Sequence, residues 1–173
     1  MPRVYIGVGS NIEPEVNIPN ALRMLAEVTP IAAISTFYRT PPMGLPDSPE
    51  FVNGVVAIDT EIEPRELKFD LLRGIEAALG RVRGSDKYEP RMIDFDIVVY
   101  GDLVIREDDL VIPNPDITER VFLAAPLLEL EPAMALPGSG EPLADVVSRM
   151  PVGQMTPLEG LTKQLRLETY LEP

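Results

Sequence analysis

Two aspartates interrupt an apolar stretch, EPRMIDFDIVVYG at residues 89–101, and their type and spacing suit chemistry. The apolar run predicts a buried strand, and because strand side chains alternate in direction, Asp94 and Asp96 share one face. Two carboxylates on one face repel each other and resist desolvation unless a cation lies between them. The pair therefore indicates a cation site, although an exposed strand face explains an Asp-x-Asp pattern equally well when it is taken alone.

Positive charge gathers immediately upstream of this pair. The stretch GRVRGSDKYEPR at residues 80–91 carries Arg81, Arg83, Lys87 and Arg91, in a chain with a formal net charge of −13. Carboxylates that bind a metal and planar guanidiniums that pair with phosphate oxygens together suit Mg²⁺-polyphosphate chemistry. Each arginine alone is explained by a solvated helix end, but the two clusters together favour the phosphate interpretation.

The composition excludes several other classes of chemistry. The chain has no histidine and no cysteine, so catalytic triads and zinc sites built from imidazole or thiolate are not available. Carboxylates without these partners suit a hard cation, Mg²⁺ first and Mn²⁺ or Ca²⁺ second. The stretch GVGSNI lacks the third glycine of a dinucleotide fingerprint, and no G-x-x-x-x-G-K-[ST] sequence is present.

Charge and hydropathy predict the partners and the compartment. The net charge of −13 argues against a nucleic-acid or acidic-membrane surface, because such binding needs clustered cations. No apolar run approaches the roughly 20 residues of a membrane span, and the N-terminus leads into a strand without a signal-peptide pattern. We expect a cytoplasmic protein with small-molecule substrates and no nucleic-acid or membrane partner, as a monomer or weak homodimer.

The predicted elements indicate an α+β fold. Strands are expected at residues 4–8, 31–40, 51–60 and 89–101, and helices at 17–28 and 63–80. This β-α-β-β-α-β order is the ferredoxin-like pattern, an antiparallel sheet with two helices on one face and the other face open for ligand. Downstream we expect a hairpin of 103–105 with 110–112, a helix at 116–130 interrupted near Pro126, and a short helix at 142–150. Residues 1–150 would form the domain, and residues 151–173 a frayed or oligomer-contacting tail that is not an independent domain.

Six stretches together give the chain a specific resemblance to a known enzyme family. In chain order they are YIGVGSN, FYRTPPMG, FVNGVVAIDT, ELKFDLLRGIEAALGRVR, PRMIDFDIVVYG and IPNPDITERVFLAAPLLEL, and they cover about residues 4–145. Their order and spacing resemble the 6-hydroxymethyl-7,8-dihydropterin pyrophosphokinase family, and the P-R-x-x-D-x-D strand with the upstream G-R-V-R is highly specific. The resemblance implies a diphosphotransferase of folate biosynthesis that moves pyrophosphate from ATP to the pterin hydroxymethyl group, with ATP as co-substrate and two Mg²⁺ ions.

The resemblance also implies a role for each matching residue. The implied metal ligands are Asp94 and Asp96, which form the catalytic set together with Arg81 and Arg91. The implied ATP-binding residues are Arg73, Glu76, Arg83, Ile97, Leu110, Asn114 and Arg120, with adenine near Ile97 and Leu110. The implied pterin-binding residues are Thr40, Pro41, Met43, Phe51, Asn53 and Phe122. Asn53 would bond the amide edge of the ring between Phe51 and Phe122, although the apolar positions suit core packing equally well.

Three positions depart from the family pattern. Asn114 follows Pro113 where the family usually has histidine, Glu89 stands where a glycine usually precedes Pro-Arg, and Tyr88 replaces a tryptophan. A neutral amide thus replaces an imidazole that contacts phosphate, and an anion lies near Arg91. These changes support an alternative function, a non-catalytic or altered-substrate relative that binds nucleotide or pterin. A Mg²⁺-dependent nuclease is a third alternative, which the acidic composition disfavours.

Overall fold

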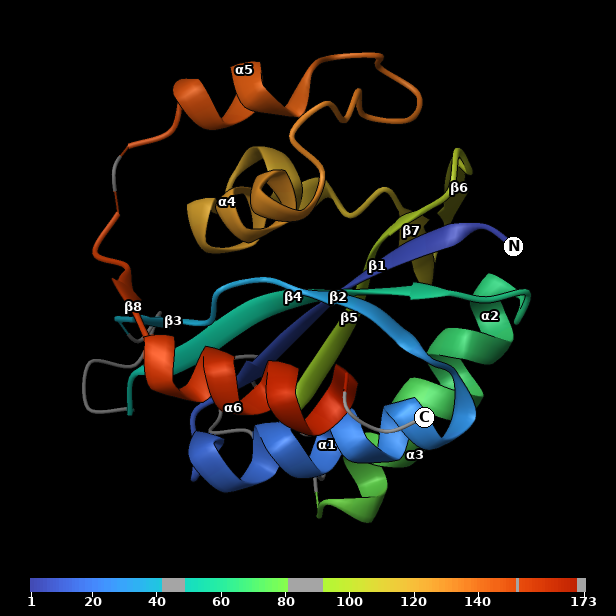
Figure 1. The fold of residues 1–173 in the computed structure, drawn as a ribbon. Helices are drawn as coiled ribbons and strands as arrows, with labels where there is room; N and C mark the ends of the chain where they lie inside the picture. The colour runs from blue at the N-terminus through green and yellow to red at the C-terminus, as the bar shows by residue number, and fades with distance from the viewer. Residues whose placement is uncertain (42–48, 81–91, 152, 171–173) are drawn as a thin grey trace.

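The computed structural model describes residues 1–41, 49–80, 92–151 and 153–170, and an antiparallel sheet lies at its centre (Figure 1). Within these residues the sheet has six strands: β1 (Arg3–Ser10), β2 (Ile31–Ile34), β3 (Tyr38–Thr40), β4 (Phe51–Asp59), β5 (Asp94–Tyr100) and β8 (Thr156–Pro157). The strand order is β5-β1-β4-β3-β8. β3 pairs with the first residues of β4, and β2 pairs with its last residues. A separate hairpin consists of β6 (Ile105–Glu107) and β7 (Leu110–Ile112).

Helices cover both faces of the sheet (Figure 1). On one face lie α1 (Pro14–Val28), α3 (Arg73–Ala78) and α6 (Glu159–Tyr170). A short helix, α2 (Pro64–Glu66), and a π-helix, η1 (Leu67–Leu72), lead directly into α3. On the other face lie α4 (Val121–Leu130) and α5 (Leu143–Ser148), and α4 follows a short 3-10 helix, η2 (Pro115–Thr118). No helix in the described part of the chain is long and apolar enough to cross a membrane.

The expectation that the second face is open for ligand is wrong. Tyr5 and Val55 point to this face and are buried in a core with Leu127 of α4 and Leu143 of α5. The central strands carry apolar side chains on both faces, so both faces must be covered to keep these side chains from water. The space for a ligand therefore lies toward one end of the sheet.

Several elements differ in extent from the prediction. Residues 31–40 form two strands, β2 and β3, because an extra residue near Ser35 interrupts the pairing with β4. The break predicted near Pro126 lies instead between η2 and α4, and α4 continues through that proline. The tail, expected to be frayed or oligomer-contacting, forms β8 and α6, and α6 packs against α1 and β2.

Candidate functional site

A cavity of about 240 Å³ lies where the end of β1 meets the beginnings of β4, β5 and α4. It is lined by nine of the predicted site residues: Thr40, Pro41, Phe51, Asn53, Asp94, Asp96, Asn114, Arg120 and Phe122. The rest of the lining comes from Gly7, Val8, Gly9, Gly54, Asp116 and Leu123. The fold thus brings the two aspartates and five of the six residues predicted to bind pterin into one space.

Backbone pairing places the two aspartates beside glycines. Asp94 pairs with Gly9 and Asp96 pairs with Gly7 across β5 and β1. On its other side Gly9 pairs with Asn53 of β4. Because glycine has no side chain, the backbone of β1 forms an open floor between the carboxylates and Asn53. Asp94 is half-buried and Asp96 is exposed.

A side chain at either glycine would enter this floor. A Cβ at Gly9 would lie 2.7 Å from Asn53 Oδ1, and a Cβ at Gly7 would lie 3.2 Å from Leu123 Cδ1. Both distances are shorter than ordinary van der Waals contact. Gly9 therefore keeps the space beside the Asn53 amide open, and Gly7 leaves room for Leu123 of α4.

The amide of Asn53 is oriented by the neighbouring strand. Its Nδ2 donates a hydrogen bond of 3.0 Å to Thr40 Oγ1, and Thr40 is only 5% exposed. Nδ2 carries a second hydrogen and Oδ1 carries lone pairs, so the amide can still donate and accept toward a ligand. Phe51 and Phe122 bring half-buried rings to the same cavity.

Polar groups enter the cavity from the segment before α4. The Asn114 N–H donates to Val98 O at 2.9 Å, and Asn114 Oδ1 accepts from the Asp116 N–H at 2.9 Å and so caps η2. Arg120 Nε lies 3.3 Å from Asp116 Oδ2, and its guanidinium carbon lies 5.8 Å from the centre of the Phe122 ring. Because Oδ1 of Asn114 is used in the cap, its amide nitrogen is the part that can donate toward a ligand.

Sequence reasoning did not assign Asp116, Leu123 or the floor glycines to the site. Sequence patterns indicate Asp116 and the two glycines. Asp116 stands four residues before Arg120, the spacing of an ion pair on a helical turn. Gly7 and Gly9 alternate within a strand, which indicates a close approach to the backbone on one face.

Four residues predicted to bind ATP do not line the described cavity. Ile97 is 5% exposed and Leu110 is 2% exposed, and both belong to the core beneath α1 and α3. Arg73 and Glu76 lie on α3, and Glu76 Oε2 accepts a hydrogen bond of 2.8 Å from the Phe95 N–H. Phe95 stands between the two aspartates, so this buried carboxylate supports the start of β5. The assignment of the four residues to ATP stays a prediction.

Several other predicted residues lie outside the described residues: Met43, Arg81, Arg83 and Arg91, with Tyr88 and Glu89. Their roles also stay predictions. The described part of the chain has no group of three or more acidic, histidine or cysteine side chains that could hold a metal ion. A cation at Asp94 and Asp96 would therefore complete its coordination with water or ligand oxygens, as Mg²⁺ commonly does.

Known proteins match most of the chain. A model of the family "7,8-dihydro-6-hydroxymethylpterin-pyrophosphokinase (HPPK)" matches residues 5–132. The 2-amino-4-hydroxy-6-hydroxymethyldihydropteridine pyrophosphokinase of Methylorubrum extorquens is 38% identical over 154 residues, which cover 87% of this chain and 94% of the relative. The enzyme of the same name from Pseudomonas aeruginosa is 36% identical over 161 residues, which cover 91% of this chain and 98% of the relative.

A solved structure shares the fold. The wild-type HPPK-DHPS of Plasmodium falciparum superposes with a TM-score of 0.65 at 13% sequence identity, over 86% of this chain and 43% of that chain. This chain spans less than half of that protein, and at such low identity the likeness shows the fold alone, an antiparallel sheet with helices. The family itself follows from the model match and from the two bacterial relatives, and it confirms the resemblance of the six stretches. The chain belongs to the 7,8-dihydro-6-hydroxymethylpterin-pyrophosphokinase family.

Proposed function

We propose that the chain transfers pyrophosphate from ATP to the hydroxymethyl group of 6-hydroxymethyl-7,8-dihydropterin, in a Mg²⁺-dependent reaction that releases AMP. The observation that carries this proposal is the shared cavity. It brings the Asp94 and Asp96 carboxylates together with the Asn53 amide and two aromatic rings. Such a lining suits a flat ring with a polar edge beside a metal-bound polyphosphate, and family membership supports the same reaction.

Asn53, Phe51 and Phe122 would bind the pterin. The ring has two apolar faces, against which phenylalanine side chains can pack. Its edge carries an amide, whose donor and acceptor match the Nδ2 and Oδ1 atoms of Asn53. The buried hydroxyl of Thr40 keeps the Asn53 amide in one orientation, which lowers the entropy lost on binding. Pro41, and Met43 outside the described residues, would complete this end of the site.

Asp94 and Asp96 suit a hard divalent cation, since both offer oxygen ligands on one strand face. We assign two Mg²⁺ ions to this end, as the family resemblance implies. Mg²⁺ bound here would offset the negative charge of the ATP phosphates.

The chain's own residues would act by positioning and electrostatics. The pterin hydroxyl oxygen attacks the β-phosphorus in line and loses its proton to solvent. The bond between the β-phosphorus and the oxygen of the α-phosphate breaks, and AMP leaves. Arg120, with the predicted Arg81, Arg83 and Arg91, would stabilise charge on the phosphates as it shifts. The sequence has no histidine or cysteine to form a covalent intermediate. Direct transfer between aligned substrates needs none.

The strand order supports a ferredoxin-like arrangement for the first half of the chain. β4 lies between β1 and the β2–β3 strand, and β5 lies on the other side of β1. A split βαβ unit produces this insertion of a later strand between the first two. This strand order is the observation that supports the ferredoxin-like arrangement we propose.

A non-catalytic relative that binds pterin and nucleotide is the second candidate function. Asn114 is the observation that favours it. Its side-chain oxygen caps η2, so the side chain offers phosphate a neutral N–H where the family usually has an imidazole that can carry charge.

The two candidates predict different products. The protein is incubated with 6-hydroxymethyl-7,8-dihydropterin, ATP and Mg²⁺, and AMP and ADP are quantified. AMP with a pterin diphosphate is the expected result, and EDTA should stop its formation. ADP would contradict the proposed transfer, and pterin binding without either product would favour the non-catalytic candidate. Asp102→Asn, which changes an exposed carboxylate just beyond β5, should keep the wild-type rate.

A further inference from the structure

The chain leaves regular strand pairing between β2 and β3. From Ile34, which pairs with Val56, to Tyr38, which pairs with Asn53, this strand advances by one residue more than β4 does. Ser35 occupies the irregular position: its N–H donates to Val55 O at 2.9 Å, and its Oγ accepts from the Val55 N–H at 2.8 Å. Such a bulge changes the direction of the strand that follows it. Residues 34–37 are called the Ser35 bulge below.

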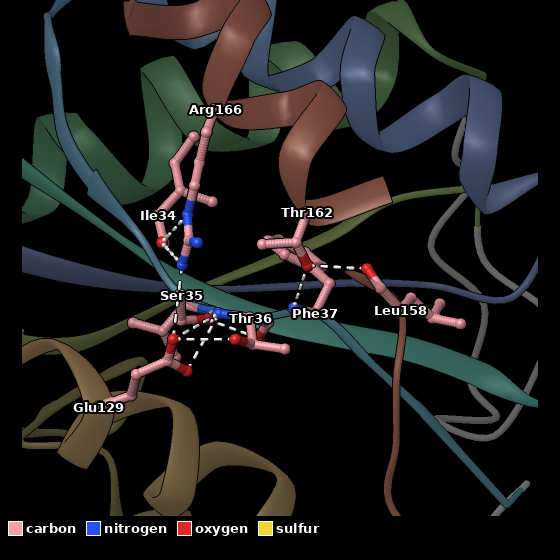
Figure 2. A network of polar contacts seen from close by, with 9 residues as sticks. Ile34, Ser35, Thr36, Phe37, Glu129, Leu158, Thr162 and Arg166 are labelled. Carbon is pink, nitrogen blue, oxygen red and sulfur yellow. Dashed lines mark hydrogen bonds and ion pairs between the residues drawn. The ribbon is translucent and has the colours of Figure 1, made fainter. Parts of the chain in front are cut away.

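A carboxylate from α4 binds the Ser35 bulge (Figure 2). The two carboxylate oxygens of Glu129 lie 3.1 and 3.0 Å from the Thr36 nitrogen, and Oε1 also accepts from Thr36 Oγ1 at 2.9 Å. The Thr36 N–H points away from β4 and toward this helix, so the carboxylate replaces the partner that a regular strand would supply.

Side chains from α6 bind the same bulge from the opposite side (Figure 2). Arg166 Nε and Nη2 donate to Ile34 O at 3.0 and 2.8 Å. Thr162 Oγ1 accepts from the Phe37 N–H at 2.9 Å and donates to Leu158 O at 2.9 Å. The Leu158 N–H in turn donates to Phe37 O at 2.8 Å. Phe37 is 0% exposed, so the C-terminal segment provides these buried backbone groups with hydrogen-bond partners.

The strand that leaves the bulge leads directly to the cavity. β3 has three residues, and Thr40 at its end receives the hydrogen bond from Asn53 Nδ2. Its outer edge pairs with β8, where Tyr38 lies opposite Pro157. So short a strand makes few ladder bonds of its own, and its position depends on the bulge before it and the strands beside it.

We infer that Thr162 and Arg166 are positioning residues for the substrate site. By fixing the Ser35 bulge they set where β3 places Thr40, and therefore the direction in which Asn53 presents its amide. The inference rests on the proposed function, because that proposal assigns Asn53 to the pterin. Both residues lie beyond position 132, where the match to the family model ends, so a segment outside that match completes the site.

Substitutions at Thr162 test the inference through substrate affinity. Thr162→Val removes the hydroxyl and keeps the branched shape, Thr162→Ser keeps the hydroxyl, and Lys163→Ala changes an exposed neighbour on the same helix. In Thr162→Val we expect the KM for pterin to rise about tenfold, with kcat and the KM for ATP within about twofold of wild type. Thr162→Ser and Lys163→Ala should stay within about twofold in all three constants.

A second measurement does not depend on turnover. Nuclear magnetic resonance of the side-chain amide of Asn53, together with hydrogen exchange of the Phe37 amide, should show a shifted signal and faster exchange in Thr162→Val. Arg166→Met, which keeps an apolar stem, should move the Asn53 signal as well and serves if Thr162→Val does not fold. An unchanged Asn53 signal with an unchanged KM for pterin, alongside a lower unfolding midpoint, would overturn the inference. If the wild type formed no AMP, the proposed function would fail, and the Asn53 signal would still decide the role of α6.

Discussion

Replacing Gly9 by alanine tests whether the open floor of the cavity sets the position of Asn53. The added Cβ would lie 2.7 Å from Asn53 Oδ1, whereas ordinary contacts begin at 3.4 Å, so the amide must move by the difference. The obstructing atom ends a short side chain that can rotate, and the fold should therefore survive. Strain of about 1 kcal/mol, the low end for overpacking, is offset by the roughly 0.5–1 kcal/mol that alanine gains over glycine within a strand.

Substrate affinity should suffer much more than stability. In the proposed site the amide of Asn53 makes two hydrogen bonds to the pterin edge, each with a net worth of about 0.5–1.5 kcal/mol. Losing both would weaken pterin binding by about 1–3 kcal/mol, which corresponds to roughly 5- to 150-fold in the dissociation constant. ATP binding should change little, because the new methyl group points at Asn53 and not at the aspartates.

Equilibrium titration of pterin fluorescence, alongside thermal unfolding, measures both quantities. Gly7→Ala is the matched control, because its Cβ would meet Leu123 Cδ1 at 3.2 Å and not the amide. This variant should bind pterin within about threefold of wild type. Equal losses of affinity in both variants would refute the reasoning, since they would trace the effect to the strand and not to Asn53. Unchanged pterin binding in Gly9→Ala would refute it as well.

Three further predictions concern charge. Asp94→Asn and Asp96→Asn should each lower AMP formation by about a hundredfold or more without lowering the unfolding midpoint, because each removes a proposed metal ligand and a like-charge neighbour; a variant that keeps a tenth of the rate contradicts the metal assignment. Asn114→His should raise single-turnover AMP formation as pH falls from about 8 to 6, because imidazole gains charge. The same change should lower the free energy of unfolding in urea titrations by about 1 kcal/mol, because the cap of η2 is weakened. Burial, and then a hydrogen bond to Glu131, raise the pKa of Tyr5 from 10.0 to about 12. The folded protein keeps this proton where the unfolded chain loses it, so the free energy of unfolding should fall as pH rises from 10 to about 12. Tyr5→Phe should remove up to about 3 kcal/mol of that fall in denaturant titrations, and an equal fall in both proteins would contradict the assignment.

The sequence predicted the central strands well and the covering layers poorly. β5 was expected because an apolar run ends at a glycine, and it lies within the expected range. The open second face was a wrong inference, although Ile97 is buried in the core beneath α1 and its neighbour Val98 in the core beneath α4, and both belong to a run that is apolar at every position. Such runs are typical of strands covered on both faces. The run therefore argued against the open face that the β-α-β-β-α-β order suggested.

The sequence also contains a pattern that indicates the C-terminal helix. Leu158, Leu161 and Leu165 recur at helical spacing and pack on the core beneath α1. The Ser35 bulge, in contrast, depends on Glu129 and residues of α6, which are distant in the chain and have no local pattern that pairs them with Thr36. The candidate site likewise has features that local sequence predicted and features that depend on the fold. Residue type and spacing predicted the aspartate pair, and the family resemblance supplied the residues predicted to bind pterin. Only the strand register shows that Gly9 lies between Asp94 and Asn53.

The ion pair between Arg166 and Glu129 has a consequence for how the molecule melts. A sheet ordinarily separates the helices on its two faces, so the two layers make no contact and each can unfold locally without the other. Here the Arg166 guanidinium from one layer lies 3.4 Å from the Glu129 carboxylate of the other, and both bind the Ser35 bulge between β2 and β3. Loosening α6 removes partners from that stretch and, through it, from α4. Heat or denaturant should therefore disrupt both hydrophobic cores in one cooperative transition, with the near-ultraviolet signals of Tyr5 on one face and Phe37 on the other lost together.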